Sequence, residues 1–95
     1  MDIRAIACNI VSERPAYSMG SLAYVVQLSN DRARILVRSR GNRWIRCWVP
    51  IVQLTSFRFR KIPPEHPLYE RIVEIGSPEF FSDSDLTALA RRRAL

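Results

Sequence analysis

The chain has few of the residues from which enzymes build active sites. Its 95 residues include one histidine, His66, and two cysteines, Cys8 and Cys47, which lie far apart in the sequence. Three such scattered side chains do not have the spacing of a zinc site. The sequence also lacks a glycine-rich phosphate loop and a Gly-x-Ser-x-Gly nucleophile motif. We therefore expect no enzyme activity, no catalytic residue, no metal and no cofactor.

Long hydrophobic runs are absent as well. No window approaches the roughly 18 consecutive apolar residues of a membrane span, and the N-terminal residues Met-Asp-Ile-Arg do not resemble a secretory signal. These absences predict a cytoplasmic protein with no membrane association. The spacing of the two cysteines permits one disulfide, but the lack of a signal peptide favours two reduced, buried thiols. A chain of 95 residues with 47% hydrophobic content is typical of one globular domain.

Acidic residues are missing from the middle of the chain. Between Arg32 and Lys61 there are nine positive charges and no negative one, and Trp44, Trp48, Phe57 and Phe59 lie among them. Such a run of one sign indicates a folded surface that meets something negative. The candidate contact residues are Arg34, Arg38, Arg40, Arg43, Trp44, Arg46, Trp48, Arg58, Arg60 and Lys61.

The first two thirds of the chain has the period-two alternation of β-strands. Asn30-Asp31 and Gly41-Asn42 are turn signals between strands, and the Pro-containing segment before the last strand is too short for more than one 3₁₀ turn. A loop is expected over residues 12–20. The predicted strands are residues 3–11, 21–29, 33–40, 43–49 and 55–62, with the 3₁₀ turn at residues 50–54.

The facing of the fourth strand depends on the length of the preceding loop. An odd-length loop, such as residues 41–43, points Cys47 inward with Ile45 and Val49, and it points Arg46 outward with both tryptophans. That loop sets Arg38 opposite Arg46 and Leu36 opposite Trp48. A two-residue loop instead turns the tryptophans inward and buries Arg46. Since a buried, unpaired guanidinium is costly, we favour the odd-length loop.

Residues 65–95 have helical signals. A first helix over residues 67–75 carries an apolar stripe of Leu68, Ile72 and Ile75 and is expected to end at Gly76. A second helix over residues 83–93 begins with a capping box, formed by Ser82 and Asp85, and a hydrophobic staple, formed by Phe81 and Leu86. The sequence thus predicts a β-barrel over residues 1–64 with a helical extension, residues 65–95, packed on it. The apolar stripe could alternatively dock a second copy or a larger partner.

Five short strands, a long loop after the first and a 3₁₀ turn before the last resemble the SH3-like small β-barrel superfamily. The segment Trp48-Val49-Pro50-Ile51-Val52-Gln53-Leu54 is similar to the part of that fold which precedes its last strand. The superfamily includes SH3 domains, Tudor and KOW modules and the C-terminal DNA-binding domain of retroviral integrases. The resemblance covers residues 3–62 and implies a mainly β (α+β) fold, a five-stranded SH3-like barrel followed by two short C-terminal helices.

The resemblance also separates two functional classes. The acidic and aromatic loop with which signalling SH3 domains hold proline-rich peptides is missing, because residues 12–20 contain only Glu13 as an acid. The basic members of the superfamily, which bind nucleic acid or ribonucleoprotein, are more similar. We therefore predict a small, non-enzymatic nucleic-acid-binding module with low sequence specificity, for DNA or RNA. The alternative is an adaptor, assembly subunit or inhibitor that docks the same basic face on an acidic protein, as a homo-oligomer or within a larger complex.

Overall fold

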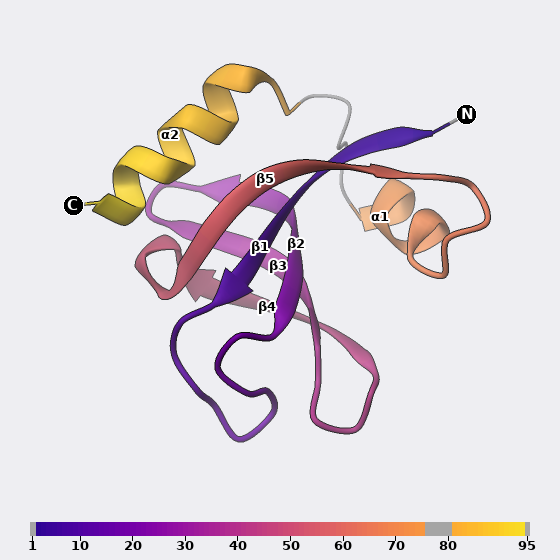
Figure 1. Cartoon of the computed structure of the whole chain (residues 1–95), viewed down its shortest axis with the longest axis horizontal. Helices are drawn as coiled ribbons and strands as arrows, with labels where there is room; N and C mark the ends of the chain where they lie inside the picture. Colours follow the sequence, from indigo (N-terminus) through magenta and orange to yellow (C-terminus); the bar gives the residue numbers. More distant parts are fainter. Residues whose placement is uncertain (1, 76–80, 95) are drawn as a thin grey trace.

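The computed structural model describes residues 2–75 and 81–94. It confirms the predicted order of five antiparallel strands followed by two short C-terminal helices, a mainly β fold with an α+β arrangement (Figure 1). None of the described helices is long and apolar enough to cross a membrane. The elements are β1 (Ile3–Ile10), β2 (Leu22–Ser29), β3 (Arg32–Arg38), β4 (Trp44–Pro50), the 3₁₀ turn η1 (Ile51–Gln53), β5 (Leu54–Ile62), α1 (Tyr69–Ile75) and α2 (Asp83–Ala94).

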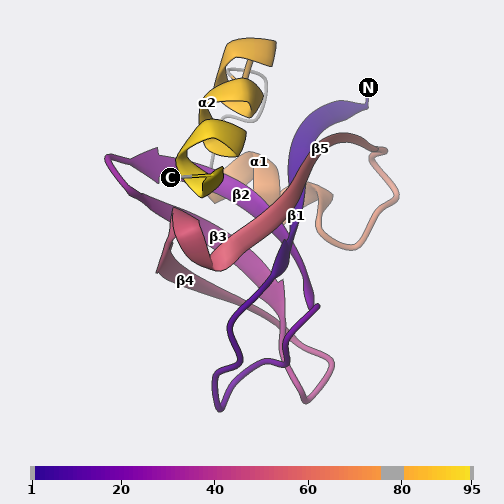
Figure 2. The same ribbon diagram turned by 60° about the vertical axis from the view of Figure 1, so that its left-hand side comes forward.

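The five strands form one sheet in the order β4-β3-β2-β1-β5. The sheet is strongly twisted, and β5 crosses the molecule beside β1 (Figure 2). Its two edges, β4 and β5, do not pair with each other, so the predicted barrel is not closed by backbone hydrogen bonds within the described residues. Strand β4 ends at Pro50, which has no N–H to donate, and the η1 turn separates it from β5. The result is a small domain consistent with a β-barrel-like fold.

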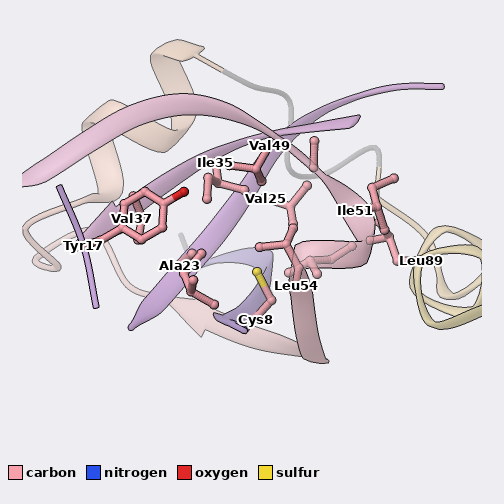
Figure 3. Close-up of a cluster of buried hydrophobic side chains, with 13 residues drawn as sticks. Cys8, Tyr17, Ala23, Val25, Ile35, Val37, Val49, Ile51, Leu54 and Leu89 are labelled. Carbon is pink, nitrogen blue, oxygen red and sulfur yellow. The ribbon is translucent and has the colours of Figure 1, made fainter. Parts of the chain in front are cut away.

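Apolar side chains cover both faces of the sheet. The first core lies on the face that carries Ile6, Val25 and Ile35, and α2 adds Leu89, which lies beside Ile51 (Figure 3). The second core lies on the opposite face, and α1 packs there. This core consists of Ala5, Ala7, Tyr24, Val26, Leu36, Ile62, Leu68 and Ile72. Alternate residues of the inner strands point to opposite faces, which explains why β1, β2 and β3 are apolar at nearly every central position.

A β-bulge in β2 interrupts the alternation of side chains between the two faces. Strict alternation would place Leu28 on the same face as Tyr24 and Val26, but it packs against the first core, while they belong to the second. The pairing with β3 shifts between Val25 and Gln27, so one additional residue is inserted in β2. Since an extra residue reverses the alternation of every side chain after it, Leu28 moves to the opposite face.

The loop between β3 and β4 has the predicted odd length, with five residues rather than three. The Ser39 N–H donates to the Arg43 carbonyl at 2.7 Å, and the Arg43 N–H donates to the Ser39 hydroxyl at 3.2 Å. Arg38 therefore pairs with Trp44, not with Arg46. The predicted pairing of Leu36 with Trp48 is also wrong, because the longer loop shifts β4 by two residues. Leu36 pairs with Arg46 instead.

A shift of two residues leaves the facing of β4 unchanged. Ile45 and Cys47 pack against the first core and Val49 is buried in it, as predicted. On the other face of β4, Arg46 is exposed. Trp44, predicted to point outward, is half-buried against the second core, and its ring centroid lies 5.8 Å from that of Tyr24.

The capping box of α2 is present as predicted. The Ser82 N–H donates to Asp85 Oδ2 at 2.7 Å, and the Asp85 N–H donates to the Ser82 hydroxyl at 3.3 Å. Phe81 and Leu86, the predicted staple, both pack against the first core. Helix α1 begins two residues later than expected, and Gly76, its predicted C-terminal cap, lies outside the described residues.

Candidate functional site

Four arginines and one tryptophan lie on the same outer face of the β3–β4 ribbon. The register pairs Arg34 with Trp48, Arg38 with Trp44 and Arg32 with Pro50. Arg46 lies between these pairs, opposite Leu36. We call this surface the β3–β4 patch; its members are Arg32, Arg34, Arg38, Arg46 and Trp48.

The pairs of the patch belong to the closely spaced class of antiparallel pairs. In the β3–β4 hairpin, Ser39 and Arg43 are a hydrogen-bonded pair, and at the other end the Ile51 N–H donates to the Asp31 carbonyl at 2.9 Å. Hydrogen-bonded and non-hydrogen-bonded pairs alternate along the ladder. Arg34 and Trp48 therefore form a non-hydrogen-bonded pair, in which side chains approach each other most closely.

The positive charge of the patch is not neutralised by carboxylates. The ion pairs among the described residues join Arg4 to Asp83 at 3.6 Å and Arg40 to Glu13 at 2.9 Å, and neither involves the patch. Arg34 donates to Gln27 Oε1 at 3.4 Å, a long hydrogen bond to an uncharged group. A surface with four guanidinium groups that have no carboxylate partner among the described residues attracts an anion.

The two tryptophans of β4 have different roles. Trp48 is 40% exposed, and the guanidinium carbon of Arg34 lies 6.0 Å from its ring centroid. Trp44 packs on Tyr24 in the second core, and its carbonyl accepts a hydrogen bond from Arg71 of α1 at 2.8 Å. Trp48 is thus the indole of the two with more surface available to a ligand, and Trp44 contributes to the packing of α1 on the sheet.

Five other residues that the sequence indicated do not join the patch. Arg40 and Arg43 lie in the loop between β3 and β4, where Arg40 is bound to Glu13. Arg58, Arg60 and Lys61 lie on β5, the opposite edge strand, with three strands between them and β4. The structure therefore divides the ten candidates among the ribbon, its loop and the far edge.

The β5 residues also differ from one another in their surroundings. Arg58 is held by Asn9 Oδ1 at 2.8 Å and by the Ser56 carbonyl at 2.6 Å. Arg60 and Lys61 are exposed. Since neighbouring residues of a strand point to opposite faces, these two cations do not share a surface.

Arg32 is a member of the patch that the sequence analysis did not select. Its position, two residues before Arg34 and six before Arg38, gives it the same facing in an unbroken strand. That parity was visible in the sequence, but Arg32 directly follows the Asn30-Asp31 turn and was not assigned to the strand. In the structure β3 begins at Arg32, whose side chain is exposed.

The thiols do not form a reactive site. Burial raises the pKa of Cys8 to about 12, although the nearby Arg58 charge acts in the opposite direction. Burial also raises the pKa of Cys47. With raised pKa values, both thiols stay protonated at neutral pH. They are therefore unreactive, because the thiolate is the reactive form. No group of three potential metal ligands occurs in the part of the chain that the structure describes.

No family model matches the chain, and neither a curated protein nor a solved structure matches it.

Proposed function

We propose that the protein is a small, non-enzymatic nucleic-acid-binding module that contacts the phosphate backbone through the β3–β4 patch. The observation that carries the proposal is that Arg32, Arg34, Arg38 and Arg46, beside the exposed Trp48, have no carboxylate partner among residues 2–75 and 81–94. Guanidinium groups bind phosphate in a bidentate geometry. Contacts of this kind hold the nucleic acid without reading its sequence, so low sequence specificity is expected.

The strength of binding should depend on salt in proportion to the number of phosphates contacted. If each of the four arginines neutralises one phosphate, the slope of log K against log salt is about −3.6 on duplex DNA and about −2.8 on single strands. Trp48 adds a platform for one unpaired base, and stacking of this kind contributes ~1–3 kcal/mol. The indole therefore favours single-stranded over double-stranded ligands.

The arrangement of the strands supports the same proposal. The order β4-β3-β2-β1-β5, with a 3₁₀ turn before β5, resembles the SH3-like layout, in which the last strand pairs with the first. Basic members of that superfamily bind nucleic acid or ribonucleoprotein. This resemblance is one of fold and does not by itself assign function, so the proposal depends on the charge and exposure of the patch.

A pair of charge-matched double variants tests the proposal. Arg38→Glu with Arg46→Glu reverses two charges in the patch, whereas Arg60→Glu with Lys61→Glu makes the same change in net charge on the far edge. The assay is fluorescence anisotropy of labelled oligonucleotides of several sequences. We expect the patch variant to lose ~3 kcal/mol or more, over 100-fold in affinity, for every sequence alike. The β5 variant should lose less than about tenfold, because salt screens distant charges.

The anisotropy assay, combined with a pull-down from lysate, distinguishes the alternative function. If the parent binds every oligonucleotide weakly, and the pull-down retains a protein partner after nuclease treatment, the patch docks on an acidic protein instead. Equal loss in both double variants would show that net charge, and not the patch, governs binding.

A further inference from the structure

The outer edge of β4 has backbone N–H and C=O groups that make no hydrogen bond with the residues the structure describes. Because Arg34–Trp48 and Leu36–Arg46 are non-hydrogen-bonded pairs, the N–H and C=O groups of Arg46 and Trp48 point away from β3. In the described part of the chain β4 pairs with β3 alone. Four backbone groups on two alternate residues are therefore open to an incoming strand, and such an edge is a template for pairing.

Each end of this open edge is closed by a different residue. At the start of β4 the outward-pointing carbonyl of Trp44 is already occupied by Arg71 of α1, at 2.8 Å. At the end of β4 the outward position is Pro50, which has no N–H. The usable edge is thus centred on Cys47 and spans residues 45–49, too short for a long added strand.

This edge is complementary to itself. When two copies pair antiparallel around Cys47, Arg46 of each copy lies opposite Trp48 of the other. All four open backbone groups of both copies then find partners in two hydrogen-bonded pairs. The occupied carbonyl of Trp44 faces Pro50 of the other copy, which has no N–H to offer it. The pairing leaves no donor of the edge unsatisfied.

We propose that the protein forms a two-fold symmetric dimer by antiparallel pairing of its β4 edges, with Cys47 on the symmetry axis. The side chains agree with this register, because Arg46 meets an indole and not another guanidinium, and Arg–Trp contacts are favourable. The dimer extends the sheet across both copies and joins the two β3–β4 patches into one surface. Dimerisation is measured without nucleic acid, so this inference stands independently of the proposed function.

The native cysteine provides the first test. The two Cys47 residues form a non-hydrogen-bonded pair, with Cα atoms about 4.5 Å apart, within the range that a disulfide spans. Diamide takes up the two electrons and two protons released when the thiols join. We expect a covalent dimer on non-reducing gels from the parent and none from Cys47→Ser, since Cys8 is fully buried.

A variant with its thiol at another exposed position serves as the control for cross-linking by random collision of monomers. Val52 is 53% exposed and lies after the end of β4, so Val52→Cys in the Cys47→Ser background gives an accessible thiol away from the axis. Paired thiols have a high effective concentration, so we expect Cys47 to cross-link at least about tenfold faster, although it is less exposed. Equal rates, or faster cross-linking at position 52, would overturn the proposal.

The mass of the protein in solution is the second test. Sedimentation equilibrium should give a concentration-dependent mass that approaches twice the 11.0 kDa of one chain. Arg46→Pro removes an outward N–H without touching the β3 ladder and should remain at the mass of one chain. Arg46→Ala keeps the N–H and should still associate. The proposed β4-edge dimer would be refuted by a parent that stays monomeric up to roughly 1 mM. It would also be refuted by a folded Arg46→Pro variant that dimerises as well as Arg46→Ala. If Arg46→Pro does not fold, the cross-linking test on the unchanged chain decides whether the dimer forms.

Discussion

Helix α1 has a buried apolar residue, Ile72, next to an exposed residue of nearly the same chemistry, Val73. Ile72 is fully buried in the second core, while Val73, the next residue, is 47% exposed. Ile72→Ala removes three carbon atoms from the packed interior and leaves a cavity among Tyr24 and Leu36. Val73→Ala removes two carbon atoms from the surface of the same helix.

Buried Ile→Ala substitutions cost ~2–5 kcal/mol of unfolding free energy, and alanine returns a few tenths of a kcal/mol of helix propensity in both variants. We therefore expect Ile72→Ala to lose ~2–4 kcal/mol and Val73→Ala to change by less than ~0.5 kcal/mol. A loss of 1 kcal/mol lowers the melting temperature of a domain this size by about 4–8 °C. Ile72→Ala should therefore melt at least ~8 °C below the parent.

Urea denaturation followed by tryptophan fluorescence and by circular dichroism measures both variants. Coincident transitions would show that α1 and the sheet unfold together, as expected if residues 65–95 belong to the same folding unit as residues 1–64. If Ile72→Ala melts at the same temperature as the parent, α1 does not stabilise the sheet, and the prediction that residues 65–95 pack on residues 1–64 is wrong for this helix.

Three further predictions follow from individual contacts. Trp44→Ala should lower the unfolding free energy by ~3 kcal/mol or more, whereas Trp48→Ala should leave stability nearly unchanged and weaken single-strand binding by ~1–3 kcal/mol; the opposite assignment would contradict the packing of the two indoles. The folded-state pKa of Cys8, about 12, exceeds its ordinary 9.0. The contribution of the buried, protonated Cys8 thiol to the free energy of unfolding is therefore fully present below pH 9 and is lost as pH rises toward 12. Melting temperatures of Cys8→Ala should accordingly fall less steeply over that range than those of the parent or of Cys47→Ser. Ser82→Ala removes the α2 cap and should cost ~0.5–2 kcal/mol in the same denaturation assay; no change would show that the cap is not needed.

The elements that local signals specify were predictable from the sequence. The capping box at Ser82 and Asp85 and the Asn30-Asp31 turn each involve residues close together in the chain. Their interactions need no distant partner, so the residues alone determine them. The facing of β4 was also predictable, because every odd-length loop gives the same parity.

Three features of the sheet were not predictable, the first because the loop sequence permits two lengths and the other two because they depend on distant segments. The β3–β4 register depends on hydrogen bonds that Ser39 makes with Arg43 across a five-residue loop, and the residue types there also suit a shorter loop. Trp44 is covered because α1, more than twenty residues later, packs on the same face. A charge count could not divide the arginines among surfaces either, since that division follows from strand order and from the ion pair of Arg40 with Glu13.

The salt dependence of nucleic-acid binding tests the central claim most directly. The association constant of the parent for a labelled duplex is measured from low to high salt, together with that of the Arg38→Glu, Arg46→Glu variant. Four phosphate contacts predict a log–log slope of about −3.6 for the parent, and the loss of two contacts should reduce its magnitude by about 1.8. A parent whose binding does not change with salt, or a variant with the parent's slope, would contradict the assignment of the β3–β4 patch as a phosphate-binding surface.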